Sequence, residues 1–222
     1  MYQSIFYKEW IKTRRLTGLL FIIFTGLITY IFIDILHQLR TSGAVDFVEA
    51  VIQKDIPLLT LMKYLPVLSG VLFAINQYTP EMQNKRFKLT LHLPLPESSI
   101  VSAMLGYGFT VMFILLSASF GSLLIGLRVL FPPEIVCANS LSALPWFLAG
   151  LAGYLIASWV SFEPVWKYRV LNAIPGICAL SFFFIPSKSG GFTTFLPELI
   201  AFIIISFSFT YYSTSRFKEG AQ

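Results

Sequence analysis

The stretch IVSAMLGYGFTVMFILLSASFGSLLIGL, residues 100–127, contains no charged side chain. A helix that crosses the hydrocarbon core of a membrane needs about 20 consecutive, mostly apolar residues, and this stretch exceeds that length. Backbone amides and carbonyls in lipid must be bonded within their own segment, which favours a helix. A strand of a membrane barrel would instead alternate polar and apolar residues. Residues 100–127 therefore predict a transmembrane helix.

The composition of the whole chain points to the same solvent. Of its 222 residues, 56% are hydrophobic and only 12% are charged, whereas soluble domains carry about 25% charged residues. This excludes a water-soluble globular protein. Further apolar runs predict five more spans, which cover residues 16–36, 58–77, 143–162, 170–185 and 199–215. Pro66 is predicted to kink the span at residues 58–77, and Pro175 and Gly176 to break the span at residues 170–185. We expect an all-α integral membrane protein with six transmembrane helices, forming a single domain over residues 1–222.

Basic residues predict the orientation of these spans, because short cytoplasmic loops are enriched in lysine and arginine. With the N-terminus inside, the inner segments hold most of them: Lys8, Lys12, Arg14, Arg15, Lys85, Arg86, Lys88, Lys167, Arg169, Arg216 and Lys218. The outer segments hold Arg40, Lys54, Arg128 and Lys188. We therefore expect both termini in the cytoplasm. The net charge of +5 fits loops that face an anionic membrane, and we expect no nucleic-acid partner.

Two flanking segments have membrane-surface character. Residues 1–15 predict an amphipathic interfacial helix, with Tyr2, Ile5, Phe6 and Trp10 on one face and Lys8, Lys12 and Arg15 toward the headgroups. The apolar run that follows is longer than that of a signal peptide, so we read it as a retained span. Residues 186–198, between the fifth and sixth spans, are apolar for a loop and predict a re-entrant segment.

The longest polar insert on the inner side, residues 78–99, predicts a short helix. Thr79 can cap its N-terminus, with Pro80 at its first position. Glu81 lies in the first turn and the basic residues lie further along, as the helix dipole favours. Pro94 and Pro96 end the helix. The alternative is a solvated loop whose lysines only follow the bias toward positive inner loops.

An acidic residue followed by a basic cluster, then Leu-Pro-Leu-Pro and a long span, resembles the permeases of type 2 ABC exporters. The six spans, the N-terminal amphipathic helix and the re-entrant region resemble that family as well. The resemblance implies a coupling helix between the second and third spans that docks on an ATPase subunit. Its docking residues would be Glu81, Lys85, Arg86, Phe87 and Lys88. The chain departs from the family at Asn84, where many members have glycine, and at Ala103 and Met104, where many have a basic residue.

The resemblance also implies partners and a location. No Walker A sequence occurs in the chain, so ATP and Mg²⁺ would bind a separate cytoplasmic ATPase chain. This chain would not be an enzyme by itself and would pair with a second copy or a homologous permease. The family implies an exporter in the inner membrane of a bacterium. The alternative is a membrane scaffold or anchor subunit of an envelope complex, which transports nothing.

Two charges lie well inside apolar runs, Asp34 and Lys63. A charge at the centre of a span costs about 2.5 to 3.5 kcal/mol on insertion scales. Both residues lie toward the outer ends of neighbouring spans, so an intramembrane ion pair between them would lower the cost of each. Two interpretations of such a pair are open: a structural role, or a role in the transport path.

The inner loop after the fourth span is a second candidate contact with the ATPase. It contains Glu163, Trp166 and Lys167, with Glu163 one helical turn before Lys167. Plain membrane anchoring by Trp166 and Tyr168 is the alternative. The two cysteines and two histidines lie in separate segments without metal-ligand spacing, so we expect no metal site and no catalytic set.

Overall fold

The computed structural model describes residues 2–43, 59–83, 96–163, 165–185 and 194–218. In these ranges the protein is all-α. Its six α-helices are α1 (Tyr2–Ser42), α3 (Leu65–Gln83), α5 (Glu97–Leu130), α6 (Pro133–Phe162), α7 (Trp166–Ser181) and α8 (Leu196–Lys218). Two short 3₁₀ turns, η1 (Thr60–Met62) and η2 (Phe182–Phe184), precede α3 and follow α7.

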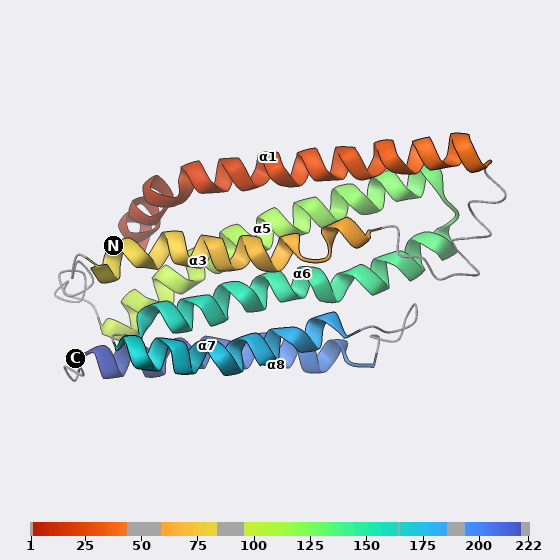
Figure 1. Cartoon of the computed structure of the whole chain (residues 1–222). Coiled ribbons are helices and arrows are strands. Elements are labelled where there is room, and N and C mark those ends of the chain that lie inside the picture. The colour runs from red at the N-terminus through yellow and green to blue at the C-terminus, as the bar shows by residue number, and fades with distance from the viewer. Residues whose placement is uncertain (1, 44–58, 84–95, 164, 186–193, 219–222) are drawn as a thin grey trace.

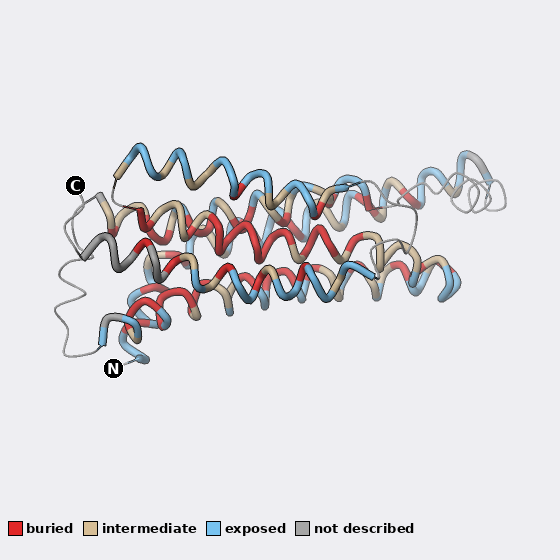
Figure 2. The backbone as a smooth tube through the Cα atoms, turned by 90° about the horizontal axis from the view of Figure 1, so that it is seen from below, coloured by how far each residue is buried: buried red, intermediate tan, exposed pale blue. Residues whose placement is uncertain are grey.

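The helices alternate in direction along one bundle (Figure 1). The start of α1, the end of α3 and the end of α8 lie together at one end, which we call the terminal end. Helix α6 is central, because it packs against α3, α5, α7 and α8. Figure 2 shows the buried residues concentrated along the middle of the bundle, and nearly all residues of α6 from Ala143 to Ser158 are buried or half-buried.

Three helices are long and apolar enough to cross a membrane, by length and composition: Tyr2–Thr41, Ser98–Leu130 and Pro133–Phe162. A shorter apolar helix covers Leu196–Thr210. The outer surface of the bundle carries large apolar side chains, among them Ile22 at 71% exposure and Val129 at 80%. Contiguous apolar surface of this kind is rare on soluble monomers. By its apolar helices the chain is a multi-pass membrane protein.

The interfacial helix and first span predicted at residues 1–15 and 16–36 form one helix. Helix α1 runs from Tyr2 to Ser42, and its first turns bend away from the axis of the rest (Figure 1). Gly43 ends it with a φ of 83°, a backbone conformation that glycine adopts without steric cost. The helix therefore ends at Ser42, beyond residue 36 where the predicted span ended.

The structure changes two predicted features of the spans and locates a third. Helix α6 begins at Pro133 and not near residue 143, because Asn139 and Ser142 bond to carbonyls one turn back and so fit inside a helix. The interruption predicted at Pro66 lies directly before it, because η1 and a bend at residues 63–64 precede α3, in which Pro66 is the second residue. Pro175 lies inside α7, which is continuous from Trp166 to Ser181.

Glycines let α3 and α6 approach closely. A Cβ atom added at Gly70 would overlap the carbonyl oxygen of Gly150, and one at Gly150 would come within 2.8 Å of the carbonyl oxygen of Pro66. A Cβ atom added at Gly153 would meet Val67 at 3.0 Å. Small residues on facing helices allow this contact in apolar surroundings. The seam sets the distance between the two helices that lead to the terminal end.

Candidate functional site

Polar side chains that are shielded from solvent connect α1, α3, α5 and α6, near the terminal end of the bundle. We call them the terminal polar cluster. Its members are Glu9, Lys12 and Thr13 of α1; Gln77, Tyr78 and Glu81 of α3; Tyr107 of α5; and Tyr154 and Ser158 of α6. Helix α3 ends at Gln83, just after Glu81, so the cluster lies at the base of the segment predicted to dock a partner.

The charged part of the cluster joins α1 to the end of α3. Lys8 Nζ lies 2.9 Å from Glu81 Oε1, and Lys12 Nζ lies 3.2 Å from the same oxygen. Lys12 Nζ also lies 2.8 Å from Glu9 Oε2. Glu9 is completely buried and Glu81 is 3% exposed, so each carboxylate depends on these partners for its charge. Two lysines and two glutamates give the group no net charge.

Glu81 is held in its charged form. Burial raises the pKa of its carboxyl group, but the hydrogen bond from Lys8 and the positive charges of Lys12 and Lys8 outweigh burial. The pKa of Glu81 therefore lies below its usual value of 4.5. At neutral pH the link between α1 and α3 is an ion pair.

The neutral part of the cluster joins α3, α5 and α6. The hydroxyl of Tyr154 lies 2.8 Å from that of Tyr78 and 3.0 Å from Gln77 Oε1. Gln77 Nε2 donates to the carbonyl oxygen of Met104 at 3.0 Å. Gly108 makes room for Tyr154, because a Cβ atom there would overlap its hydroxyl. The chain of bonds crosses three helices and satisfies both ends of the Gln77 amide.

A second bond ties α1 to α5. Thr13 Oγ1 lies 2.6 Å from the hydroxyl of Tyr107 and 2.9 Å from the carbonyl oxygen of Glu9, to which it donates. Phe6 packs edge-on against the Tyr107 ring with 5.6 Å between centroids. The first turns of α1 are thus fixed to α3 by charge and to α5 by a hydroxyl pair.

Glu81, one of the residues predicted to dock a partner, is buried at the end of α3. Its side chain is 4% exposed and lies against Lys8 and Lys12. The predicted start of the coupling helix is wrong, because Thr79 and Pro80 lie inside α3 and do not begin a new helix. The other docking residues, Lys85, Arg86, Phe87 and Lys88, lie outside the described residues, as does the rest of the predicted coupling helix to residue 95.

The predicted ion pair between Asp34 and Lys63 does not form among the described residues. Asp34 Oδ2 accepts a hydrogen bond of 2.9 Å from Gln38 Nε2, one turn further along α1. Lys63 Nζ lies 5.4 Å from the centre of the Tyr64 ring, where a cation is attracted to the aromatic face. Each charge finds a partner close by in sequence, so neither needs the other.

The three residues of the second predicted ATPase contact differ in solvent exposure. Glu163 is completely buried, and its Oε2 atom accepts a hydrogen bond of 2.9 Å from Ser213 of α8. Its backbone oxygen accepts one of 2.7 Å from Arg169 Nε. Trp166 is 73% exposed and Lys167 is exposed. Glu163 therefore joins α6 to α8, while Trp166 and Lys167 remain on the surface.

Sequence reasoning missed most of the terminal polar cluster. Gln77, Tyr78, Tyr107 and Tyr154 lie in apolar runs that are far apart in sequence, and nothing in a single run shows which residues of another run it will meet. One signal was available, because Gln77 is an amide at the inner end of a predicted span. Glu9, three residues before Lys12, was another.

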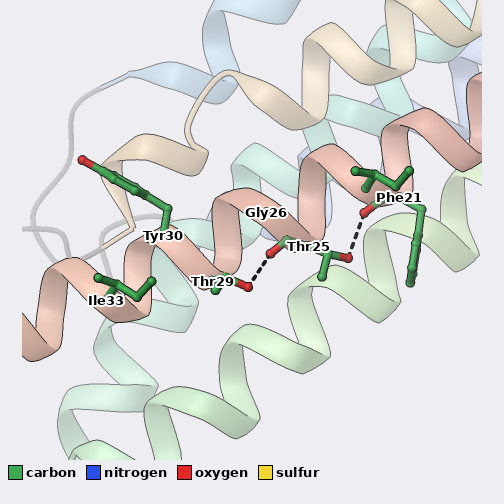
Figure 3. Close-up of a pocket in the computed structure, with 7 residues that line it drawn as sticks. Phe21, Thr25, Gly26, Thr29, Tyr30 and Ile33 are labelled. Carbon is green, nitrogen blue, oxygen red and sulfur yellow. Dashed lines mark hydrogen bonds between the residues drawn. The ribbon is translucent and has the colours of Figure 1, made fainter.

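A groove runs along the outer face of α1 (Figure 3). It is lined by Phe21, Ile22, Thr25, Gly26, Thr29, Tyr30 and Ile33. The hydroxyls of Thr25 and Thr29 donate to carbonyl oxygens one turn back, each at 2.8 Å. The groove therefore offers mainly apolar surface, without a set of polar groups that would orient a ligand.

Comparisons of the chain with models of known protein families, with curated proteins and with solved structures find no match.

Proposed function

We propose that this chain is the membrane-spanning permease subunit of an ATP-driven ABC transporter, and that it works as an exporter. All six α-helices cross the inner membrane of a bacterium in this proposal, with the terminal end in the cytoplasm. ATP and Mg²⁺ bind a separate ATPase chain that docks on residues 84–95. A second permease, identical or homologous, completes the transport path.

The observation that carries the proposal is the position of the segment between α3 and α5. Helix α3 ends and α5 begins at the same end as the start of α1 and the end of α8 (Figure 1). Lys8 and Lys12 of α1 lie near this end, and the sequence between α3 and α5 contains Lys85, Arg86 and Lys88. A basic insert between two helices, on the side rich in basic residues, suits docking of a soluble cytoplasmic partner.

The terminal polar cluster supplies a physical route for coupling. A force applied to residues 84–88 acts on the end of α3, and Glu81 ties that end to Lys8 and Lys12 of α1. Tyr78 and Gln77 tie it to Tyr154 of α6. In this proposal the ATPase moves α1, α3 and α6 together and so changes access to the path between two permeases.

The test is ATP hydrolysis in the assembled transporter. The chain is co-expressed with a soluble ABC-type ATPase from the same organism, and the complex is purified in detergent. We expect Lys85→Glu with Arg86→Glu to lower co-purification of the ATPase and to abolish stimulation of its activity, because reversed charges meet the same docking surface. Arg40→Glu with Arg128→Glu, at the opposite end, is the matched control and leaves both unchanged.

A scaffold without transport activity gives the opposite result. In that case no ATPase co-purifies with the intact chain, and reversing the charges at residues 85 and 86 changes no hydrolysis. Either finding contradicts the permease proposal.

A further inference from the structure

The four basic residues in the first turns of α1 fall into two pairs. Lys8 and Lys12 turn toward the bundle, where Glu9 and Glu81 neutralise them. Arg14 and Arg15 are exposed. Among the described residues no carboxylate pairs with either arginine. The inward pair therefore holds the helix in place, and the outward pair leaves two uncompensated positive charges on its surface.

The outward charges lie beside aromatic and apolar side chains. Tyr7 is 67% exposed, and Trp10 and Ile11 are each 47% exposed. Tyr7, Ile11 and Arg14 follow one another at spacings of four and three, so they share one face of the helix. Buried Ile5, Glu9 and Thr13 occupy the other face. The exposed face combines cations with amphipathic rings.

This face stands at the edge of the predicted hydrocarbon layer. Arg15 immediately precedes the apolar run of residues 16–33, which belongs to a helix long enough to cross a membrane. Tryptophan and tyrosine prefer the interface between water and lipid. Basic residues next to a span are attracted to anionic headgroups, whose charge is complementary.

We propose that Arg14 and Arg15, with Trp10 and Tyr7, form a binding surface for the anionic headgroups of a bilayer. The ion pairs of Lys8 and Lys12 fix the rotation of α1 and so turn this surface outward. Of the basic residues predicted to face the headgroups, Lys8 and Lys12 pair with carboxylates, whereas Arg15 is exposed, as is Arg14. The proposal does not depend on transport, since it concerns the position of the chain in its membrane.

The experiment measures lipid affinity of the full chain in non-ionic detergent. Short-chain phosphatidylglycerol and phosphatidylcholine are titrated separately, and bound lipid is counted by native mass spectrometry. We expect tighter binding of phosphatidylglycerol. Arg14→Gln with Arg15→Gln should weaken it about 30-fold, near 5-fold for each arginine, and should leave binding of phosphatidylcholine unchanged.

Lys8→Gln with Lys12→Gln is the matched comparison, because it removes two charges from the same turns. It should lower the melting temperature and change phosphatidylglycerol affinity by less than about 3-fold, about one tenth of the effect of the arginine pair. Lys8→Gln alone serves if the double variant does not fold, since Lys8 is the more exposed of the two.

Three results would overturn the proposal. One is equal affinity of the unaltered chain for the two lipids. Another is an equal loss of phosphatidylglycerol binding in the lysine and arginine variants, which would mean that all four cations face the headgroups. The last is displacement of the lipid by inorganic phosphate at similar concentration, which would identify a site for free phosphate and not for a bilayer.

Discussion

At the scale of single residues, the buried charges of the terminal polar cluster stand out from their surroundings. Glu9 and Glu81 are almost fully buried in a chain that has few charges. Burying an isolated carboxylate is costly, and a close amine and good hydrogen bonds are needed to offset that cost. Lys12 serves both carboxylates, so losing one member of the group disturbs the others.

Replacing Glu81 by Gln tests this dependence through pH. The pKa of Glu81 is lower in the folded chain than its usual 4.5. Its contribution to stability is therefore fully present above pH 4.5 and is lost as pH falls through the folded pKa. We expect the unaltered chain to lose melting temperature on acidification below pH 4.5, measured by thermal unfolding in detergent.

The Glu81→Gln variant should lose about 2 kcal/mol of unfolding free energy at neutral pH and should therefore have a lower melting temperature. This is less than the 3 to 5 kcal/mol of a fully buried pair, because Lys8 is partly exposed and can turn to water. On acidification, the melting temperature of the variant should fall less than that of the unaltered chain. Glu134→Gln, at an exposed position, is the control, and an equal effect there would show that the response is not specific to Glu81.

At the scale of helices, the contact between α3 and α6 decides how the cluster is assembled. Gly70, Gly150 and Gly153 allow the two backbones to approach. The same approach brings Tyr78 and Gln77 within reach of Tyr154. The packing of the glycine seam and the hydrogen bonds of the cluster therefore support each other.

Gly150→Ala should disturb this seam. The added methyl group would come within 2.8 Å of the carbonyl oxygen of Pro66, a backbone atom that cannot rotate away. Overpacking of this kind costs about 1 to 3 kcal/mol, seen as a lower melting temperature. Gly121→Ala is the control, because no atom lies within 4 Å of a Cβ atom there. A stable Gly150→Ala variant would mean that α3 and α6 are further apart.

At the scale of the whole molecule, the alternating helices place both ends of the chain on one side. Helix α1 starts and α8 finishes at the terminal end (Figure 1). Three helices meet the length and hydropathy of a membrane span, while α3, α7 and α8 are shorter. If all six cross, the turn after Leu130 and the end of α1 face the other side.

Fusions to alkaline phosphatase, which is active only outside the cytoplasm, measure this directly. We expect activity when the enzyme is joined after Gly43 or Phe131, and none when it is joined after Glu163 or at the C-terminus. The reason is that two helices of opposite direction, α3 and α5, separate Gly43 from Phe131, and two more, α7 and α8, separate Glu163 from the C-terminus. Activity after Glu163 would contradict the six-span arrangement, and expression of each fusion is checked by antibody.

Much of the fold can be predicted from composition and periodicity. The stretch at residues 100–127 is helical, as predicted, and belongs to α5, which extends it slightly at both ends. Each predicted span contains a helix over most of its length, because long apolar runs leave the backbone few other ways to bond itself. Helix ends were less predictable, as at Pro133 and Pro175, since side chains and neighbouring helices decide whether a proline or a polar residue is tolerated.

The sequence by itself determined that this chain is helical, apolar and basic at one end, because these properties depend on residue type and order alone. Only the tertiary structure decided the direction in which each charged side chain points. The sequence predicted headgroup contacts for Lys8 and Lys12 and a docking role for Glu81. In the structure, Lys8 and Lys12 of α1 pair with Glu81 of α3. The reason is that a charge in a poorly solvating interior takes the nearest opposite charge, and tertiary packing decides which charge is nearest.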